Sequence, residues 1–223
     1  MKNQKKAAII LGATGLTGSL LLGKLLADPT YSSIKLFSRR ECGIDSPKIR
    51  EYVGDLFQLD KYKEDFKADE VFCCIGTTSA KTSDRDIYKA IDFGIPVSAS
   101  ILARENKIPT FIVMSSLGAN PRSKVFYSRT KGEMEEAVIA QNITHTYILR
   151  PSLILGKRNE KRFGESAGAI LLKMAKVFLH GRIRKYRAIE ARCIAEAMIQ
   201  LARTLPDMRI VPSDIIQELG NDS

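Results

Sequence analysis

Tyr127 and Lys131 stand four residues apart in a segment with helical character. On a helix, that spacing places both side chains on one face, about one turn apart. An ammonium beside a phenol favours the phenolate, so such a pair can move a proton to or from a carbonyl or alcohol oxygen. Tyr-x-x-x-Lys also arises by chance, and it becomes informative only together with the elements that position it.

Two serines, Ser115 and Ser116, follow an apolar run at residues 110–114 that predicts a strand. Ligands of open α/β sheets bind at the carboxyl ends of the strands. A serine hydroxyl at that edge could donate a hydrogen bond to the same substrate oxygen that Tyr127 would protonate. The residues themselves do not decide which serine does so.

A glycine-rich loop follows the first apolar run, residues 7–11, and a leucine-rich helical segment begins at once. The loop consists of Gly12, Ala13, Thr14, Gly15, Leu16, Thr17 and Gly18. In a strand–loop–helix unit, such glycines permit a tight turn, backbone approach to a pyrophosphate and close helix–strand packing. Free N–H groups and the helix dipole then favour a diphosphate. The loop therefore predicts a dinucleotide site, and the alternative is a plain strand-to-helix turn.

The end of the second predicted strand, residues 34–37, indicates which dinucleotide is bound. NAD sites usually carry Asp or Glu there, which bonds the ribose 2′-OH. The residues here are Ser38, Arg39 and Arg40. Guanidinium groups offer fixed donor pairs to a 2′-phosphate, so we expect NADP(H), unless the arginines only solvate a loop. Farther on, Asp55 and Leu56 follow a short strand, where the carboxylate either accepts from the adenine amino group or is an ordinary loop residue.

Strands and helices alternate along the chain, which predicts an α/β fold with a doubly wound parallel sheet. Right-handed crossovers would place helices on both faces. The expected strands cover residues 7–11, 34–37, 51–53, 71–75, 110–114, 144–149 and 209–211. The expected helices cover residues 15–27, 92–105, 127–140, 168–179 and 189–203, and Ser213 caps a final short one. No repeat or linker divides the chain, so we expect one domain, residues 1–223, in which residues 152–223 form a C-terminal extension that contributes the substrate pocket.

Together these motifs resemble the atypical NAD(P)H-binding branch of the short-chain dehydrogenase/reductase superfamily. The resemblance covers about residues 5–155. Besides the segments already named, it rests on Cys73, Cys74, Ile75, Gly76, Thr77 and Thr78, on Leu117, Gly118 and Ala119, and on Arg150, Pro151 and Ser152. It implies an NADP-binding Rossmann fold with intact motifs for oxidoreductase chemistry.

The resemblance also implies a role for each site residue. Ser116 would orient the substrate, Tyr127 would be the acid/base, and Lys131 would hold the nicotinamide ribose and tune the tyrosine. Ser115 would pack or lie near the cofactor. The remaining cofactor contacts would come from Ile75, Gly76, Thr77, Pro151 and Ser152.

Two classes of function fit this pattern. The first is an NADP(H)-dependent oxidoreductase acting on a small carbonyl or alcohol substrate. Because the protein carries an excess of positive charge, this substrate could be anionic. The second is an NADP(H)-binding regulatory or redox-sensing protein with little or no turnover. An isomerase that recycles its bound cofactor is a third option.

The net charge of +10 is uneven, because residues 157–187 hold ten Lys/Arg against Glu160 and Glu165. Such a segment attracts phosphorylated substrates, membrane surfaces or nucleic acid, or it is a solubilising surface. No aromatic-interleaved basic motif supports nucleic-acid binding. The apolar stripe at residues 170–178 packs inside, forms a pocket wall, or contacts a membrane or a second copy in a homodimer.

Composition excludes several other classes. Apolar residues make up 44% and charged residues 27% of the 223 residues, values typical of a globular chain. No apolar stretch is long enough to predict a transmembrane segment. Cys42, Cys73, Cys74 and Cys193 show neither disulfide nor zinc spacing, and His145 and His180 lack partners at ligand spacing. We therefore expect no metal site and a cytoplasmic location.

Overall fold

The apolar runs of the sequence form the inner strands of a parallel sheet. A computed structural model describes residues 5–78, 81–156 and 186–221. Within these residues the sheet has seven strands in the order β3-β2-β1-β4-β5-β6-β9, and every neighbouring pair is parallel. The strands are β1 (Lys6–Leu11), β2 (Tyr31–Ser38), β3 (Ile49–Val53), β4 (Glu70–Cys73), β5 (Thr110–Met114), β6 (His145–Arg150) and β9 (Ile210–Pro212). The strand order reverses between β1 and β4, which confirms the expected doubly wound Rossmann fold.

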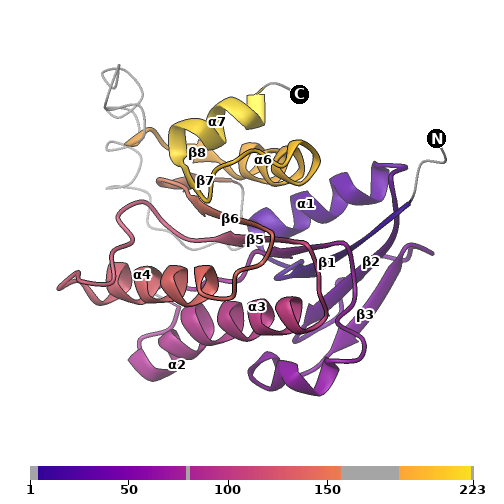
Figure 1. The fold of residues 1–223 in the computed structure, drawn as a ribbon, viewed down its shortest axis with the longest axis horizontal. Coiled ribbons are helices and arrows are strands. Elements are labelled where there is room, and N and C mark those ends of the chain that lie inside the picture. The colour runs from indigo at the N-terminus through magenta and orange to yellow at the C-terminus, as the bar shows by residue number, and fades with distance from the viewer. Residues whose placement is uncertain (1–4, 79–80, 157–185, 222–223) are drawn as a thin grey trace.

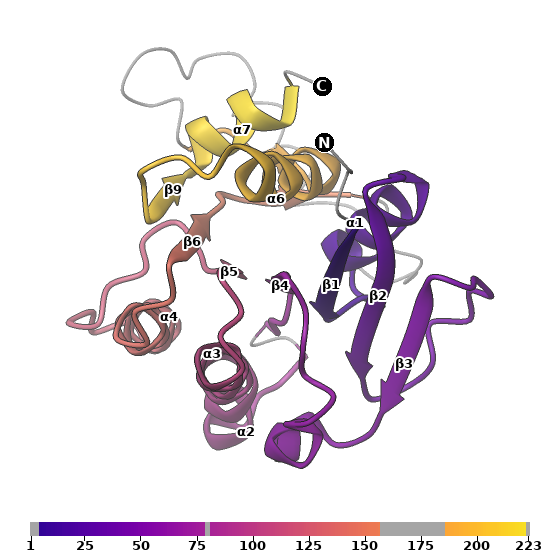
Figure 2. The same cartoon turned by 45° about the vertical axis from the view of Figure 1, so that its right-hand side comes forward.

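Helices cover both faces of this sheet (Figures 1 and 2). One face carries α1 (Leu16–Ala27), α6 (Ala191–Thr204) and α7 (Ser213–Asn221), and the other carries α2 (Arg85–Lys89), α3 (Ile95–Glu105) and α4 (Phe126–Ile139). Strand β1 contributes to both layers, because successive side chains point to opposite faces. Ala8 and Ile10 pack with α1 and α6, whereas Ile9 and Leu11 pack with α3 and α4. This burial on both faces explains why the central strands are apolar throughout.

The helix expected over residues 92–105 begins earlier than the sequence predicts. Helical backbone starts with α2, whose first amides donate to the carboxylate of Asp84. A π-helical segment, η2 (Ala90–Gly94), then joins α2 to α3. Pro96 lies in the first turn of α3, yet helical residues precede it. The prediction placed the helix start from the position of Pro96, because proline is tolerated only in the first turn of a helix. It did not foresee that a π-helical segment can join a preceding helix to that first turn.

The C-terminal part follows the expected order. The helix expected over residues 189–203 is α6, and the strand expected over residues 209–211 is β9, which pairs with β6 at the sheet edge. A separate two-stranded ladder joins β7 (Ile154–Leu155) to β8 (Ile189–Glu190). Short strands of this kind give no clear periodicity, and the sequence did not predict them.

Some expectations fall on residues outside the described ranges. These are the helix over residues 168–179, His180, and the basic segment at residues 157–187 apart from its last two residues. Among the helices that are described, none is long and apolar enough to span a bilayer.

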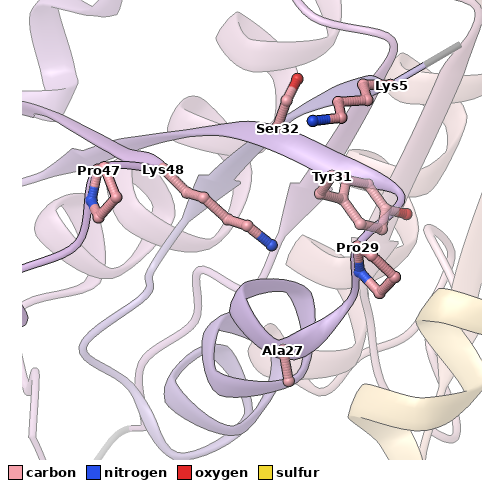
Figure 3. A pocket seen from close by; sticks show the side chains of 7 residues that line it. All are labelled: Lys5, Ala27, Pro29, Tyr31, Ser32, Pro47 and Lys48. Atoms are coloured by element: carbon pink, nitrogen blue, oxygen red, sulfur yellow. The ribbon is translucent and has the colours of Figure 1, made fainter.

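A hollow of about 480 Å³ opens at the amino edge of the sheet (Figure 3). It is lined by Lys5, Ala27, Pro29, Tyr31, Ser32, Pro47 and Lys48. The Lys48 ammonium donates to the carbonyl oxygens of Leu26 and Asp28, at 2.8 and 2.9 Å, so it caps the end of α1. The hollow lies opposite the carboxyl ends of the strands, where the sequence predicts the functional site.

A buried carboxylate fixes the position of α4 over that carboxyl edge. Glu135 of α4 is 3% exposed and accepts a hydrogen bond from the Ser115 hydroxyl. Its carboxylate also pairs with the guanidinium of Arg150, the last residue of β6, whose Nε is 3.0 Å from Oε1. The pair raises the pKa of Arg150. One side chain therefore ties α4 to the ends of β5 and β6.

We expect Glu135→Gln to lower the free energy of unfolding by about 3 kcal/mol, because it leaves the half-buried guanidinium without a counter-ion. Urea unfolding measures this loss. Glu64→Gln is the control, since Glu64 forms an exposed pair with Lys67 that contributes little. Equal midpoints for the two variants would show that the buried pair does not hold α4.

Candidate active site and cofactor cleft

The glycine loop makes close backbone contacts that side chains would prevent. Gly12 has φ +85°, and a Cβ added to it would lie 3.0 Å from the carbonyl carbon and oxygen of Cys74. A Cβ at Gly18 would overlap the carbonyl oxygen of Gly12. The loop thus packs against the turn after β4 and against its own helix. This is the cradle that close approach of a pyrophosphate requires.

The start of α1 is arranged to receive an anion. Gly15 stands at its N-cap, and within the described residues no side chain caps the first turn and no acidic residue lies in it. Thr14 and Gly15 are exposed, whereas Ala13 and Thr17 are buried. Uncapped N–H groups and the helix dipole favour a diphosphate at this point. The residues present therefore fit the diphosphate of a dinucleotide.

The two arginines lie at the carboxyl end of β2. Arg39 and Arg40 are exposed, and the buried Ser38 hydroxyl donates to the carbonyl oxygen of Arg40 at 2.6 Å. This hydrogen bond tightens the turn that presents both guanidinium groups. A phosphate could reach them from solvent. Their contact with a 2′-phosphate stays a prediction.

Asp55 has a structural use that the sequence did not predict. It caps the 3-10 helix η1 (Leu56–Tyr62), and its Oδ1 accepts from the amide of Phe57 at 2.9 Å. The side chain of Leu56 is buried, so only its backbone could face a ligand. The predicted adenine contact of Asp55 would have to share a carboxylate that already accepts two hydrogen bonds.

Lys131 is buried with a counter-ion. Its Nζ lies 2.7 Å from Oδ1 of Asp92 and 3.3 Å from the carbonyl oxygen of Met114, the last residue of β5. The two charged side chains are only 4% and 1% exposed. The Lys131 ammonium is thus held at the carboxyl edge of the sheet, where it bonds the carbonyl oxygen of Met114, the residue two positions before Ser116.

The two candidate serines differ in their partners. Ser115 donates its hydroxyl to Glu135, within the network that holds α4. The Ser116 hydroxyl is buried and has no hydrogen-bond partner in the part of the chain that the structure describes. A buried hydroxyl without a partner costs about 1–3 kcal/mol unless a ligand or water satisfies it. Ser116 is therefore free to bond a substrate oxygen, whereas Ser115 is already engaged.

Tyr127 is the second residue of α4 and remains 40% exposed. Its ring meets the buried ring of Tyr88 edge-to-face, with centroids 6.2 Å apart. One turn later, Gly132 lets α4 approach the loop after β5, because a Cβ there would overlap Asn120 and Pro121. The Tyr127 side chain is therefore partly open to solvent, while the close packing at Gly132 fixes the helix that carries it.

The last predicted contacts come from two neighbouring turns. Strand β4 ends at Cys73, two residues before the expected end at Ile75, so residues 75–77 form a turn at the carboxyl edge. On the other side, Pro151 is buried and Ser152 donates its hydroxyl to the carbonyl oxygen of Arg187. Ser213 donates to Ser152 at 3.2 Å instead of capping α7. Contact of Pro151 and Ser152 with a nicotinamide stays a prediction.

Sequence reasoning missed three buried polar residues of this site: Tyr88, Asp92 and Glu135. A signal for Asp92 was present, because it lies at helical spacing from Ile95 and Ala99 on an apolar face, where a carboxylate is rarely buried without a partner. Metal ligation does not explain these acids: in the described ranges, no three His, Cys, Asp or Glu side chains gather as a metal would need. The four cysteines are free thiols.

Comparison with known proteins identifies the family. Residues 12–175 match the NAD(P)H-binding family. The chain belongs to the NAD(P)H-binding, atypical short-chain dehydrogenase/reductases. It is 35% identical over 159 residues to "Protein FMP52, mitochondrial" of Candida albicans, which covers 69% of each chain. It is 33% identical over 168 residues to "Protein HTATIP2" of Rattus norvegicus, which covers 74% of this chain and 69% of that one.

Solved structures share the fold. The enzyme WbmH of Bordetella bronchiseptica, in complex with NAD⁺, aligns with a TM-score of 0.72 at 14% identity and covers 97% of this chain and 80% of its own. The UDP-N-acetylglucosamine 4-epimerase of Methanobrevibacter ruminantium aligns with a TM-score of 0.68 at 17% identity and covers 93% and 75%. At these identities the likeness concerns the Rossmann architecture alone.

The expected cytoplasmic location is wrong. Relatives from Candida albicans, Scheffersomyces stipitis, Candida glabrata and Debaryomyces hansenii all bear names that call them mitochondrial. The expectation relied on cysteine usage, which is typical of reducing compartments in general and does not separate one of them from another.

We expect Gly18→Ala to lower the Tm and to weaken NAD(P)H binding at least tenfold, because the added carbon pushes α1 away from the loop. Gly23→Ala in the same helix is the control, since an added Cβ there meets no atom within 4 Å. This control should gain about 0.5–1 kcal/mol of stability and bind normally. Thermal unfolding and nucleotide titration compare the two, and similar binding by both variants would contradict the role of the loop.

Proposed function

We propose that the protein is an NADP(H)-dependent oxidoreductase that interconverts a small carbonyl compound and its alcohol. The observation that carries the proposal is the Ser116 hydroxyl, buried at the carboxyl edge of the sheet with no partner among the described residues. The Lys131 ammonium bonds the carbonyl oxygen of Met114, the last residue of the strand that Ser116 follows, and Tyr127 belongs to the same helix as the lysine. Family membership supports nucleotide binding, and these three side chains support oxidoreductase chemistry.

NADP(H), when bound, supplies the hydride that the protein itself cannot provide. The loop at residues 12–18 would hold the diphosphate against the start of α1. Arg39 and Arg40 would pair with the 2′-phosphate, and the turn at residues 75–77 would line the nicotinamide half. Lys131 would donate to the hydroxyls of the nicotinamide ribose.

The chain's own residues would handle the proton and the developing charge. In the direction of carbonyl reduction, the Tyr127 phenol gives its proton to the substrate oxygen. Ser116 donates a hydrogen bond to that oxygen as negative charge develops on it, and a donor positioned in advance lowers the barrier without reorganisation. In the reverse direction, Tyr127 takes the proton back from the alcohol.

The C-terminal part, from residue 152 onward, would shape the substrate pocket. Gly156 lies against Leu16 at the start of α1, where an added Cβ would be 2.7 Å from the leucine Cδ1. Leu153, three residues earlier in the sequence, is 59% exposed, and its side chain could form an apolar wall of the pocket. We therefore favour a substrate with a modest apolar part, and an anionic group on it would be attracted by the positive net charge.

Arg39→Ala is expected to raise the Kd for NADPH about 10- to 100-fold, the loss of one charge-assisted contact to phosphate. The Kd for NADH should stay unchanged, because NADH lacks the 2′-phosphate. Fluorescence titration measures both, and Arg104→Ala on the exposed side of α3 serves as the charge-matched control. Equal affinity of the native protein for the two nucleotides would refute the assignment of NADP(H).

Tyr127→Phe is expected to reduce NADPH oxidation at least 100-fold across a panel of small carbonyl compounds, because it removes the proton donor. NADPH affinity should change less than threefold. Tyr52→Phe is the control, since Tyr52 lies on β3 and its phenol donates to Asp65. Turnover that survives in Tyr127→Phe would exclude the mechanism. Tight NADPH binding by the native protein without turnover on any compound would favour the sensing protein instead.

A further inference from the structure

The hydroxyl group of Tyr88 is buried without a partner. The residue is 3% exposed, and its Oη forms no hydrogen bond within residues 5–78, 81–156 and 186–221. An unpaired buried donor is unfavourable, and folded proteins satisfy the large majority of their buried polar side-chain atoms. The mechanism proposed above does not use this hydroxyl. A ligand that arrives after folding is one way to satisfy it.

Tyr88 stands opposite the proposed proton donor. Tyr88 and Asp92 are four residues apart on the helical run of α2 and η2. Tyr127 and Lys131 are likewise four residues apart on α4. The two runs meet at both levels. Oδ1 of Asp92 lies 2.7 Å from Nζ of Lys131, and the ring of Tyr88 meets the ring of Tyr127 edge-to-face. The contact with Tyr127 thus places Tyr88 beside the reacting end of α4.

Two aromatic neighbours fix the position of the Tyr88 hydroxyl. Its ring packs edge-to-face against the ring of Phe126, with centroids 5.6 Å apart, and against that of Tyr127, with centroids 6.2 Å apart. The phenol oxygen lies on the long axis of the ring, so a ring that is held on two sides also holds its oxygen. The hydroxyl therefore cannot swing to another acceptor without breaking these contacts.

The surroundings of Tyr88 also fix its charge. Burial raises the pKa of the Tyr88 phenol, and Asp92 and Tyr127 raise it further, so the hydroxyl stays neutral. A neutral phenol can donate a hydrogen bond at every working pH. The groups that oppose a negative charge on this phenol also oppose an anionic ligand group beside it. The complementary partner is therefore a neutral acceptor, such as a hydroxyl or carbonyl oxygen.

We propose that Tyr88 is a substrate-binding residue whose hydroxyl donates a hydrogen bond to a second oxygen of the substrate. The inference rests on the proposed function, in which Ser116 and Tyr127 engage the reacting oxygen. Because the rings of Tyr88 and Tyr127 are in contact, the second oxygen belongs to a carbon close to the reacting one. The substrate class is then a small ketone or aldehyde with a neutral hydroxyl or carbonyl group on a neighbouring carbon.

The first test measures whether the hydroxyl is free in the unliganded protein. Tyr88→Phe keeps the ring contacts and removes only an unpaired buried group, so we expect the Tm to rise by about 2–4 °C. Tyr31→Phe is the matched control, since Tyr31 is also buried and its hydroxyl donates to Glu70 at 2.6 Å. The control should lower the Tm. A similar fall for Tyr88→Phe would overturn the proposal, because a water or a protein group would then already satisfy the hydroxyl.

The second test compares two ketones that differ only at the second oxygen. Hydroxyacetone carries a hydroxyl where butanone carries a methyl group. We expect native kcat/KM for NADPH oxidation to be at least tenfold higher with hydroxyacetone. Tyr88→Phe should lose about tenfold with hydroxyacetone, mainly through KM, and stay within twofold with butanone, as expected for one lost hydrogen bond. Tyr31→Phe should keep the native ratio.

Equal use of the two ketones by the native protein would overturn the proposal, and so would an equal loss on both in Tyr88→Phe. Failure of the proposed function looks different, because the native protein would then oxidise NADPH with neither ketone and with no other carbonyl compound of the panel. The Tm comparison does not depend on turnover, so it would still show whether the Tyr88 hydroxyl is free for a ligand.

Discussion

The close approach of three backbone segments at the carboxyl edge of the sheet is the constraint on which the site depends. The loop after β1, the first turn of α1 and the turn after β4 meet without side chains between them, and Gly12 and Gly18 make this possible. Within the described residues no side chain caps the start of α1, so its first N–H groups stay available to an anion. The same packing fixes the turn at residues 75–77, which lies beside the Asp92–Lys131 pair. In the proposed function, phosphate binding and the chemistry of α4 are therefore linked through backbone geometry.

Two buried carboxylates, those of Glu135 and Asp92, fix α4 at different points along its length. Glu135 accepts from Ser115 and Arg150, and it anchors the middle of the helix to the ends of two strands. Asp92 pairs with Lys131 and anchors the first half of the helix to η2. The partners differ in exposure: the Arg150 side chain is 31% exposed, whereas the Lys131 side chain is 4% exposed. A partly exposed arginine suits a structural anchor, and the buried lysine is the one to which the proposed function assigns a ligand.

Most of the fold could be predicted from the sequence because parallel strands buried on both faces leave an apolar signature. The runs that became β1, β5 and β6 are of this kind, and the glycine loop marks the first crossover. The helix start at Arg85 could not be found, because Pro96 suggested a boundary that the π turn of η2 removes. The ladder of β7 and β8 was too short to show periodicity.

Residue type and spacing could predict which residues are candidates for the site, but not which partners they have in the folded chain. Tyr127, Lys131 and the serines could be named, since they follow strands and helices in the expected order. Spacing could not show which serine has an internal partner, because Ser115 is bound by Glu135, which lies 20 residues away in the sequence. The same holds for Asp92, which meets Lys131 only after two crossovers have brought η2 and α4 together. Contacts between distant segments give the residues of a motif different environments, and those environments decide which of them can act on a ligand.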